Sequence, residues 1–249
     1  MSEVSVRRRI LYTTDRMPFT SSGLDTVGIR LALHKGLRSH LIPQLVLEES
    51  SSSSVIYTDR HSRHVHFTFY DRVVDVTFTV PYTCREHNFF LSDEYEFKQC
   101  VAKLENRYDI DLNIGFINRI DIATTIETLE PIERYFSILK TPKRYKPDET
   151  YSTTRYFNTT NVVFIVYNKT VKSSSQLKYV REYCDDILTP NLSRVELRLE
   201  NSVADTLRRH QILHNRKLLP ADLYARDCFI EMLSLDKNKA VPGVKIGRK

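Results

Sequence analysis

The sequence is poor in several features that mark large protein classes. It has only six glycines in 249 residues, and none lies in a Gly-x-x-x-x-Gly-Lys or Gly-x-Gly-x-x-Gly frame. This argues against a nucleotide-driven motor and against a dinucleotide enzyme. No run of about 18 apolar residues exists, so we expect no membrane-spanning helix. Residues 1–9 also lack the hydrophobic region of a secretory signal.

Cysteine is sparse as well. The four cysteines are far apart and form no Cys-x-x-Cys pair: Cys84, Cys100, Cys184 and Cys228. We therefore expect neither a zinc site nor a disulfide framework, and a reducing cytoplasm is the simplest compartment.

Basic residues are in excess. The net charge is +6 and the isoelectric point is near 9.1, which favours a polyanionic partner, with nucleic acid first and an acidic membrane second. The length and the 41% apolar content allow a sizeable core. We expect residues 1–23 to be a flexible basic arm, 24–236 the folded domain, and 237–249 a basic tail.

Residues 161–169 form a near-continuous apolar, β-branched run that predicts a buried strand. Counting by two places Tyr167 and Lys169 on one face of this strand. A phenol and an ammonium two residues apart suit a phosphoryl-transfer site. A tyrosine at the end of a buried strand is, however, more often part of the core.

Two further stretches, 118–125 and 192–200, alternate between apolar and charged residues. Each stretch gathers its charged side chains on one face: Arg119, Asp121, Arg194, Glu196, Arg198 and Glu200. One interpretation is a half-exposed antiparallel sheet with cross-strand charge pairs. The other is a single surface in which Asp121 and Glu196 supply oxygen ligands for Mg²⁺ or Mn²⁺ beside Tyr167.

A hairpin is predicted from strands 63–70 and 73–80, with its turn at Asp71-Arg72. Its first strand holds His64-Val-His66, which puts two imidazoles on one face. This pattern resembles the His-hydrophobic-His metal motif of rolling-circle nickases and relaxases, but it also arises by chance on amphipathic strands. His64 and His66 are therefore an alternative to the carboxylates as metal ligands.

Helical periodicity predicts five helices: 92–108, 130–140, 177–187, 201–216 and 220–235. In the first, Ser92 is the expected cap. Basic residues in the loop 141–154 and on the helix 201–216 suit contacts with nucleic acid, although a solvated loop is the plain alternative for the former. These residues are Lys143, Arg144, Lys146, Arg208 and Arg209. The whole pattern predicts an α+β domain with a largely antiparallel sheet and helices on one face.

Three motifs follow one another along the chain: Arg-Ile-Asp at 119–121, Tyr-Asn-Lys at 167–169, and Arg-Val-Glu-Leu-Arg-Leu-Glu at 194–200. They resemble the core of nicking replication initiators, namely the gene II-type proteins of filamentous phages and related rolling-circle plasmid initiators. The residues 25–31 resemble the opening strand of the phage members. The segment 155–160 stands where plasmid relatives carry a Tyr-x-Gly-Ser turn. The resemblance covers roughly residues 24–215.

The resemblance implies a Rep nickase-like fold and a tyrosine that attacks a phosphodiester at the replication origin. The attack forms a phosphotyrosine bond and frees a 3′-hydroxyl as primer. Tyr167 is the first candidate nucleophile and Tyr156 the second. Asp121 and Glu196 would hold Mg²⁺ or Mn²⁺. Phosphate contacts are expected from Lys169, Arg119, Arg194 and Arg198. One departure is that the better-known nickases place a lysine three residues after the tyrosine, whereas Lys169 is two after Tyr167.

The implied partner is origin DNA, single-stranded or supercoiled, in the cytoplasm of a host cell. A host helicase is expected as a second partner because the sequence has no nucleotide-binding frame. No membrane is expected to take part, and no oligomeric state follows from the sequence. Two alternatives remain: a non-catalytic, repressor-like DNA-binding protein, and a mobilisation relaxase with the same chemistry.

Overall fold

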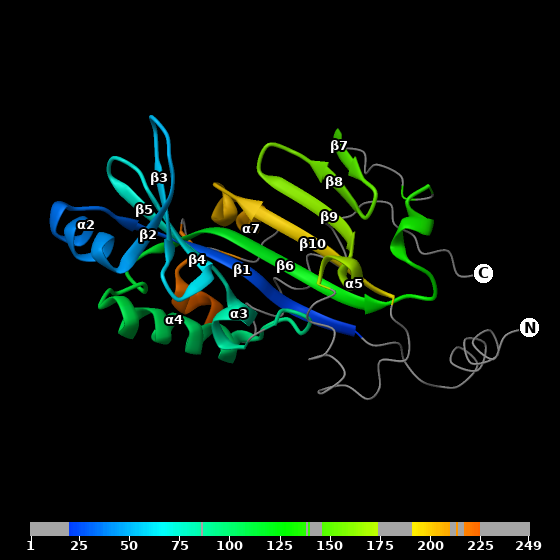
Figure 1. Cartoon of the computed structure of the whole chain (residues 1–249), viewed down its shortest axis with the longest axis horizontal. Coiled ribbons are helices and arrows are strands. Elements are labelled where there is room, and N and C mark those ends of the chain that lie inside the picture. The colour runs from blue at the N-terminus through cyan, green and yellow to red at the C-terminus, as the bar shows by residue number, and fades with distance from the viewer. Residues whose placement is uncertain are drawn as a thin grey trace, which may run out of the picture.

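A single ten-stranded sheet organises the computed structural model (Figure 1). The structure describes residues 20–85, 87–137, 139, 146–173, 191–209, 213 and 217–224. Every pair of neighbouring strands in the sheet is antiparallel, in the order β2-β3-β4-β5-β1-β6-β10-β9-β8-β7. The predicted α+β class with an antiparallel sheet is confirmed.

The strands are β1 (Thr20–Ala32), β2 (Leu45–Ser50), β3 (Val55–Asp59), β4 (Ser62–Phe69), β5 (Val73–Thr79), β6 (Phe116–Glu127), β7 (Lys146–Tyr151), β8 (Thr154–Asn158), β9 (Val162–Asn168) and β10 (Leu192–Glu200). The α-helices are α2 (Lys35–Leu41), α3 (Val80–Cys84), α4 (Glu94–Tyr108), α5 (Lys169–Lys172) and α7 (Val203–Arg209). Short 3-10 helices are η1 (Ile42–Gln44), η2 (Ile132–Tyr135) and η4 (Pro220–Tyr224).

The strand order divides the sheet into two halves with the same topology. In each half the first strand, β1 or β6, is innermost, and the last strand, β5 or β10, lies beside it. The remaining strands follow toward the outer edge in reverse order of sequence. A helix follows the last strand of each half, as α3 and α4 follow β5 and α7 follows β10. The two halves join where β1 pairs with β6.

One face of the sheet carries the core. Helix α4 lies along this face (Figure 1) and buries Phe97, Val101, Leu104 and Tyr108 in it. Val203 and Leu207 of α7 and Leu223 of η4 belong to the same apolar cluster. Burying these side chains, at about 1.5–3 kcal/mol each, holds the helices to the sheet. The predicted helices on one face are thus confirmed.

The other face carries polar side chains, because strand residues alternate between the two faces. The register brings Asp121 of β6 opposite Thr26 of β1 on one side and Arg198 of β10 on the other. The β1–β6 pairing is interrupted between Leu24 and Thr26, which leaves Asp25 as an extra residue. Such a bulge turns Asp25 to the polar face, beside Thr26.

Several elements differ from those predicted. Among the described residues of the segment 130–140, the helical element is the 3-10 turn η2, because the Arg155 guanidinium binds the carbonyl oxygens of Phe136 (2.5 Å) and Leu139 (2.9 Å), which a continuing helix would use. Part of the predicted loop 141–154 instead forms β7, because backbone pairing with β8 overrides its polar sequence.

Other boundaries also move. The N-cap of α4 is Asp93, whose carboxylate accepts from the amide of Glu96 at 2.9 Å, and Ser92 instead forms a β-bridge with Leu24. Strand β1 begins within the predicted arm. Within the predicted helices 201–216 and 220–235, the described residues include α7 and the 3-10 helix η4, and residues 225–235 lie outside the described part of the chain. The predicted helix 177–187, most of the arm and the tail 237–249 lie outside the described residues.

A disulfide joins Cys84 of α3 to Cys100 of α4, with the two Cα atoms 6.1 Å apart. The expectation that the cysteines would not pair is therefore wrong. It failed because separation along the sequence says nothing about two helices that pack side by side. Within the described ranges, no helix is both long and apolar enough to cross a membrane.

Candidate functional site

Charged side chains from β6 and β10 meet on the polar face. The Arg119 guanidinium donates two hydrogen bonds to Asp121, Nε to Oδ1 at 3.1 Å and Nη2 to Oδ2 at 2.7 Å. Arg198 bridges two carboxylates, donating from Nε to Asp121 Oδ2 at 3.2 Å and from Nη2 to Glu196 Oε1 at 3.0 Å. Glu200 lies 3.6 Å from Arg119 and 3.8 Å from Arg198. The polar faces of the two predicted strands thus form one surface.

Burial shapes the charges of this network. Asp121 is 1% exposed and Glu196 4% exposed. Burial, and then the neighbouring carboxylates of Asp121 and Asp25, raise the pKa of Glu196 to about 7, although Arg198 and Arg194 oppose the change. Burial also opposes the charge on Arg198, but Asp121 and Glu196 outweigh it and raise the pKa of the guanidinium. The carboxylates are therefore crowded, and Glu196 changes protonation near neutral pH.

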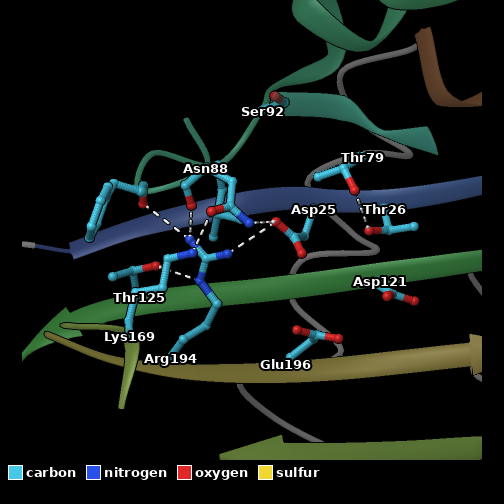
Figure 2. Close-up of polar contacts among 12 residues, drawn as sticks. Asp25, Thr26, Thr79, Asn88, Ser92, Asp121, Thr125, Lys169, Arg194 and Glu196 are labelled. Atoms are coloured by element: carbon cyan, nitrogen blue, oxygen red, sulfur yellow. Dashed lines mark hydrogen bonds and ion pairs between the residues drawn. The ribbon is translucent and has the colours of Figure 1, made fainter. Parts of the chain in front are cut away.

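Arg194 forms a second, fully buried group of contacts (Figure 2). Its Nε donates to Thr125 Oγ1 at 2.9 Å, and its Nη1 donates to Asp25 Oδ1 at 3.0 Å. Its Nη2 donates to the carbonyl oxygens of Asn88 and Phe89, the latter at 3.2 Å. One side chain therefore ties β10 to β6, to β1 and to the segment between α3 and α4.

Tyr167 lies opposite Arg194 in the β9–β10 pairing and is 3% exposed. Burial raises the pKa of its hydroxyl well above the ordinary value, against the opposing influence of Arg194. The Lys172 ammonium lies 4.3 Å from the centre of its ring. In this conformation the first candidate nucleophile is protonated and shielded from solvent.

Tyr156 of β8 is half-buried, and its ring centre lies 6.0 Å from that of Tyr151. It pairs with Ile165, which in turn pairs with Glu196, so the three residues form one row on the polar face. With strands about 4.8 Å apart, Tyr156 lies roughly 10 Å from the Glu196 backbone. It is the more accessible of the two candidate tyrosines.

Lys169 is 2% exposed and lies next to the Arg194 group. Its Nζ donates to Asn88 Oδ1 at 2.5 Å and lies 5.3 Å from the centre of the Phe89 ring. Burial and the positive charge of Arg194 lower the pKa of Lys169 to about 6. A buried lysine of this kind is mostly uncharged at pH 7.

Sequence reasoning missed two residues of this site, Asp25 and Asn88. Asp25 follows a strand pattern, but only the bulge, which depends on pairing with β6, turns it toward Arg194. Asn88 lies in a stretch of no regular pattern, and its Nδ2 donates to Asp25 Oδ1 at 3.2 Å. No local sequence signal could have found it, because its partners are far away along the chain.

The other predicted residues make contacts with partners outside this cluster or lie outside the described part of the chain. His64 stacks on Tyr82 with ring centres 3.6 Å apart, and His66 bonds Glu48 at 3.1 Å. On α7, both Arg208 and Arg209 contact Asp205, through its carboxylate and its carbonyl oxygen respectively. Lys143 and Arg144 lie outside the described residues, and Lys146 begins β7.

The predicted metal ligands have suitable chemistry but are already engaged. Carboxylate oxygens are the ligands that Mg²⁺ and Mn²⁺ prefer. Both Asp121 oxygens, however, accept hydrogen bonds from guanidinium groups. Among the described residues, no group of three or more His, Cys, Asp or Glu side chains is arranged to hold a metal ion. A cation at Asp121 would therefore replace a contact with Arg119 or Arg198.

Comparisons with known proteins give a distant structural likeness. No protein-family profile and no curated protein matches the chain. The solved structure of a rolling circle replication initiator protein from Geobacillus stearothermophilus is 13% identical over 77% of this chain and 78% of its own, with a TM-score of 0.43. At that TM-score the likeness establishes neither a shared fold nor a shared activity.

Proposed function

We propose that this chain nicks DNA to start rolling-circle replication, through the attack of a tyrosine hydroxyl on a phosphodiester. The oxygen–phosphorus bond to the tyrosine forms as the bond to the 3′-oxygen breaks, which leaves a phosphotyrosine and a free 3′-hydroxyl. One observation carries the proposal. A basic chain brings three arginines, three carboxylates, a lysine and two tyrosines together on β6, β8, β9, β10 and the start of α5, and all of them except Tyr156 belong to the three motifs that resemble nicking initiators.

Exposure divides the roles of the three arginines. The side chains of Arg119 and Arg198 are each 27% exposed, whereas Arg194 is 0% exposed. One planar guanidinium group can bind two oxygens of a phosphate with two parallel hydrogen bonds. Because Arg119 and Arg198 are partly exposed, they are the proposed phosphate contacts. Arg194 holds the framework behind them.

Burial favours Tyr156 over Tyr167 as the nucleophile. Tyr156 is half-buried on the same face as Glu196, whereas the hydroxyl of Tyr167 is enclosed and its pKa is raised. A tyrosine needs a nearby cation or base at neutral pH, because its ordinary pKa is about 10. Mg²⁺ or Mn²⁺ held by Asp121 and Glu196 would supply that positive charge and polarise the phosphate. It would also relieve the repulsion that raises the pKa of Glu196.

The test is a covalent adduct. Purified protein, supercoiled DNA from its own replicon and either metal ion are incubated, and adducts that survive boiling in detergent are counted. Tyr156→Phe should abolish the adduct, and Tyr167→Phe should leave part of it. Tyr95→Phe, at a tyrosine of α4 that is 65% exposed, is the matched control and should change nothing. Tight binding of the DNA with no nick under either metal would refute the proposal.

A second candidate, a non-catalytic DNA-binding protein, is favoured by one specific observation. The ion network is complete as it stands, with Asp121 saturated by arginines and Tyr167 shielded from solvent. Such a network serves stability without any reaction. The adduct assay distinguishes the two candidates. A non-catalytic DNA-binding protein should form no adduct, and both tyrosine variants should bind DNA as the natural sequence does.

A further inference from the structure

Asn88 touches three titratable residues of the site at once, Lys169, Asp25 and Arg194 (Figure 2). Its Oδ1 accepts from Lys169 Nζ at 2.5 Å, its Nδ2 donates to Asp25 Oδ1 at 3.2 Å, and its carbonyl oxygen accepts from Arg194. We propose that Asn88 is a positioning residue, whose side chain fixes the Lys169 amine against Asp25 and Arg194. The inference deepens the proposed nicking function and rests on it for the role of Lys169.

The segment 87–92 that carries Asn88 is fixed near its C-terminal end. The backbones of Leu24 and Ser92 exchange hydrogen bonds of 2.8 and 3.0 Å, which adds the segment to the edge of β1. The Arg85 guanidinium donates to Ser92 Oγ at 3.3 Å and to Glu96 at 2.9 Å. This anchoring places Asn88 over the polar face with little freedom, as a positioning residue requires.

The chemistry of the amide suits this role. An asparagine side chain offers an acceptor and a donor together, so it satisfies an amine on one side and a carboxylate on the other. An aspartate at position 88 would accept from Lys169 but repel Asp25. It would also place a negative charge against the amine, and an opposite charge at this distance favours the protonated form.

The neutrality of Asn88 matters because the other groups around Lys169 are charged or titratable. Arg194 and Glu196 face it from β10, Asp25 from β1, Lys172 from α5, and His87 from the same segment as Asn88. The two cations and burial outweigh the carboxylates, and the pKa of Lys169 is about 6. Asn88 therefore orients an amine that is mostly uncharged at pH 7 and gains its proton as the pH falls through about 6.

The test measures the titration of Lys169 directly, by ¹³Cε lysine NMR of the full chain, with the resonance assigned by its loss in Lys169→Met. Lys169 should titrate near pH 6 in the natural sequence, and Asn88→Asp should raise its pKa by about 1–3 units. Ser53→Asp adds the same charge in an exposed loop and should leave the titration unchanged. The inference would be overturned if Lys169 titrated near its ordinary pKa of about 10.4, or if its pKa in Asn88→Asp were the same as in the natural sequence.

Nicking assays add a second reading. The pH profile of nicking should shift upward in Asn88→Asp by the same amount as the Lys169 titration. Asn88→Ser, which removes the amide and adds no charge, should lower the rate without moving the profile. If Asn88→Asp does not fold, the titration of Lys169 in the natural sequence and the pH profile of nicking by Asn88→Ser still test whether Asn88 positions Lys169. A shifted titration without any nicking would refute the proposed function and leave the positioning of Lys169 by Asn88 standing.

Discussion

Replacing Arg194 by methionine should be among the most damaging single changes to stability in this chain. The methionine fills much of the same space but donates nothing. It removes the ion-pair partner of the Asp25 carboxylate and the donors to the Thr125 hydroxyl and to the carbonyl oxygens of Asn88 and Phe89, all of which Arg194 binds in a fully buried position. Breaking a buried ion pair from one side costs about 3–5 kcal/mol.

Urea denaturation measures this loss. With an m value of about 3 kcal/mol per molar urea, a loss of 3–5 kcal/mol lowers the midpoint by about 1–2 M. The matched control is Arg72→Met, because the Arg72 side chain is 92% exposed and forms an ion pair with Asp71, whose side chain is 94% exposed. That change should stay within about 0.5 kcal/mol.

A double variant separates the ion pair from the other contacts. Asp25→Asn combined with Arg194→Met removes the orphaned charge, so it should be more stable than the sum of the two single losses predicts. A loss below about 1 kcal/mol for Arg194→Met alone would refute the reasoning, since a buried guanidinium with these partners cannot be so easily replaced.

Three further predictions concern Glu196, Gly23 and the disulfide. The raised pKa of Glu196, about 7, means that the folded state binds its proton more tightly than the unfolded chain does, so stability falls as pH rises from about 4.3 to 7. The free energy of unfolding of Glu196→Gln, measured relative to that of the natural sequence, should therefore increase between pH 5 and pH 8. If the difference between the two proteins does not change with pH, the raised pKa of Glu196 is contradicted. Gly23→Ala places a Cβ against the carbonyl oxygen of Ser92 and should cost about 1–3 kcal/mol by thermal denaturation. Gly36→Ala, where the nearest atom is a His34 ring nitrogen at 3.3 Å, is its control and should cost much less. Reducing the Cys84–Cys100 disulfide, which spans 16 residues, should lower the free energy of unfolding by about 3 kcal/mol, and alkylation of both thiols without reductant would show that the bond is absent.

The charged faces of the two alternating strands were predictable because a period of two needs no knowledge of neighbours. Arg119 and Asp121 share a face with Glu196 and Arg198, as alternation alone requires once β6 and β10 pair. Alternation does not predict how deeply these side chains are buried. The side chains of Asp121 and Glu196 are almost completely buried. This could not be predicted, because burial depends on everything that packs above the sheet.

Contacts made by residues outside a regular pattern could not be predicted from the sequence. Asn88 and Arg194 are brought together by the bridge between Leu24 and Ser92, which no periodicity encodes. The helix predicted at 130–140 failed for a similar reason, since Arg155 from β8 binds its carbonyl oxygens. In both cases a distant side chain or strand overrode the local pattern.

The matching topology of the two halves has a consequence for how the site could be divided. The halves meet through their first strands, β1 and β6, and the site draws Asp25 and Asn88 from one half and Arg194 and Lys169 from the other. Neither half alone contains a complete set of partners. A chain cut between α4 and β6 would leave two five-stranded fragments, and the site would exist only where they recombine. Activity from the separated pieces would thus report fragment complementation.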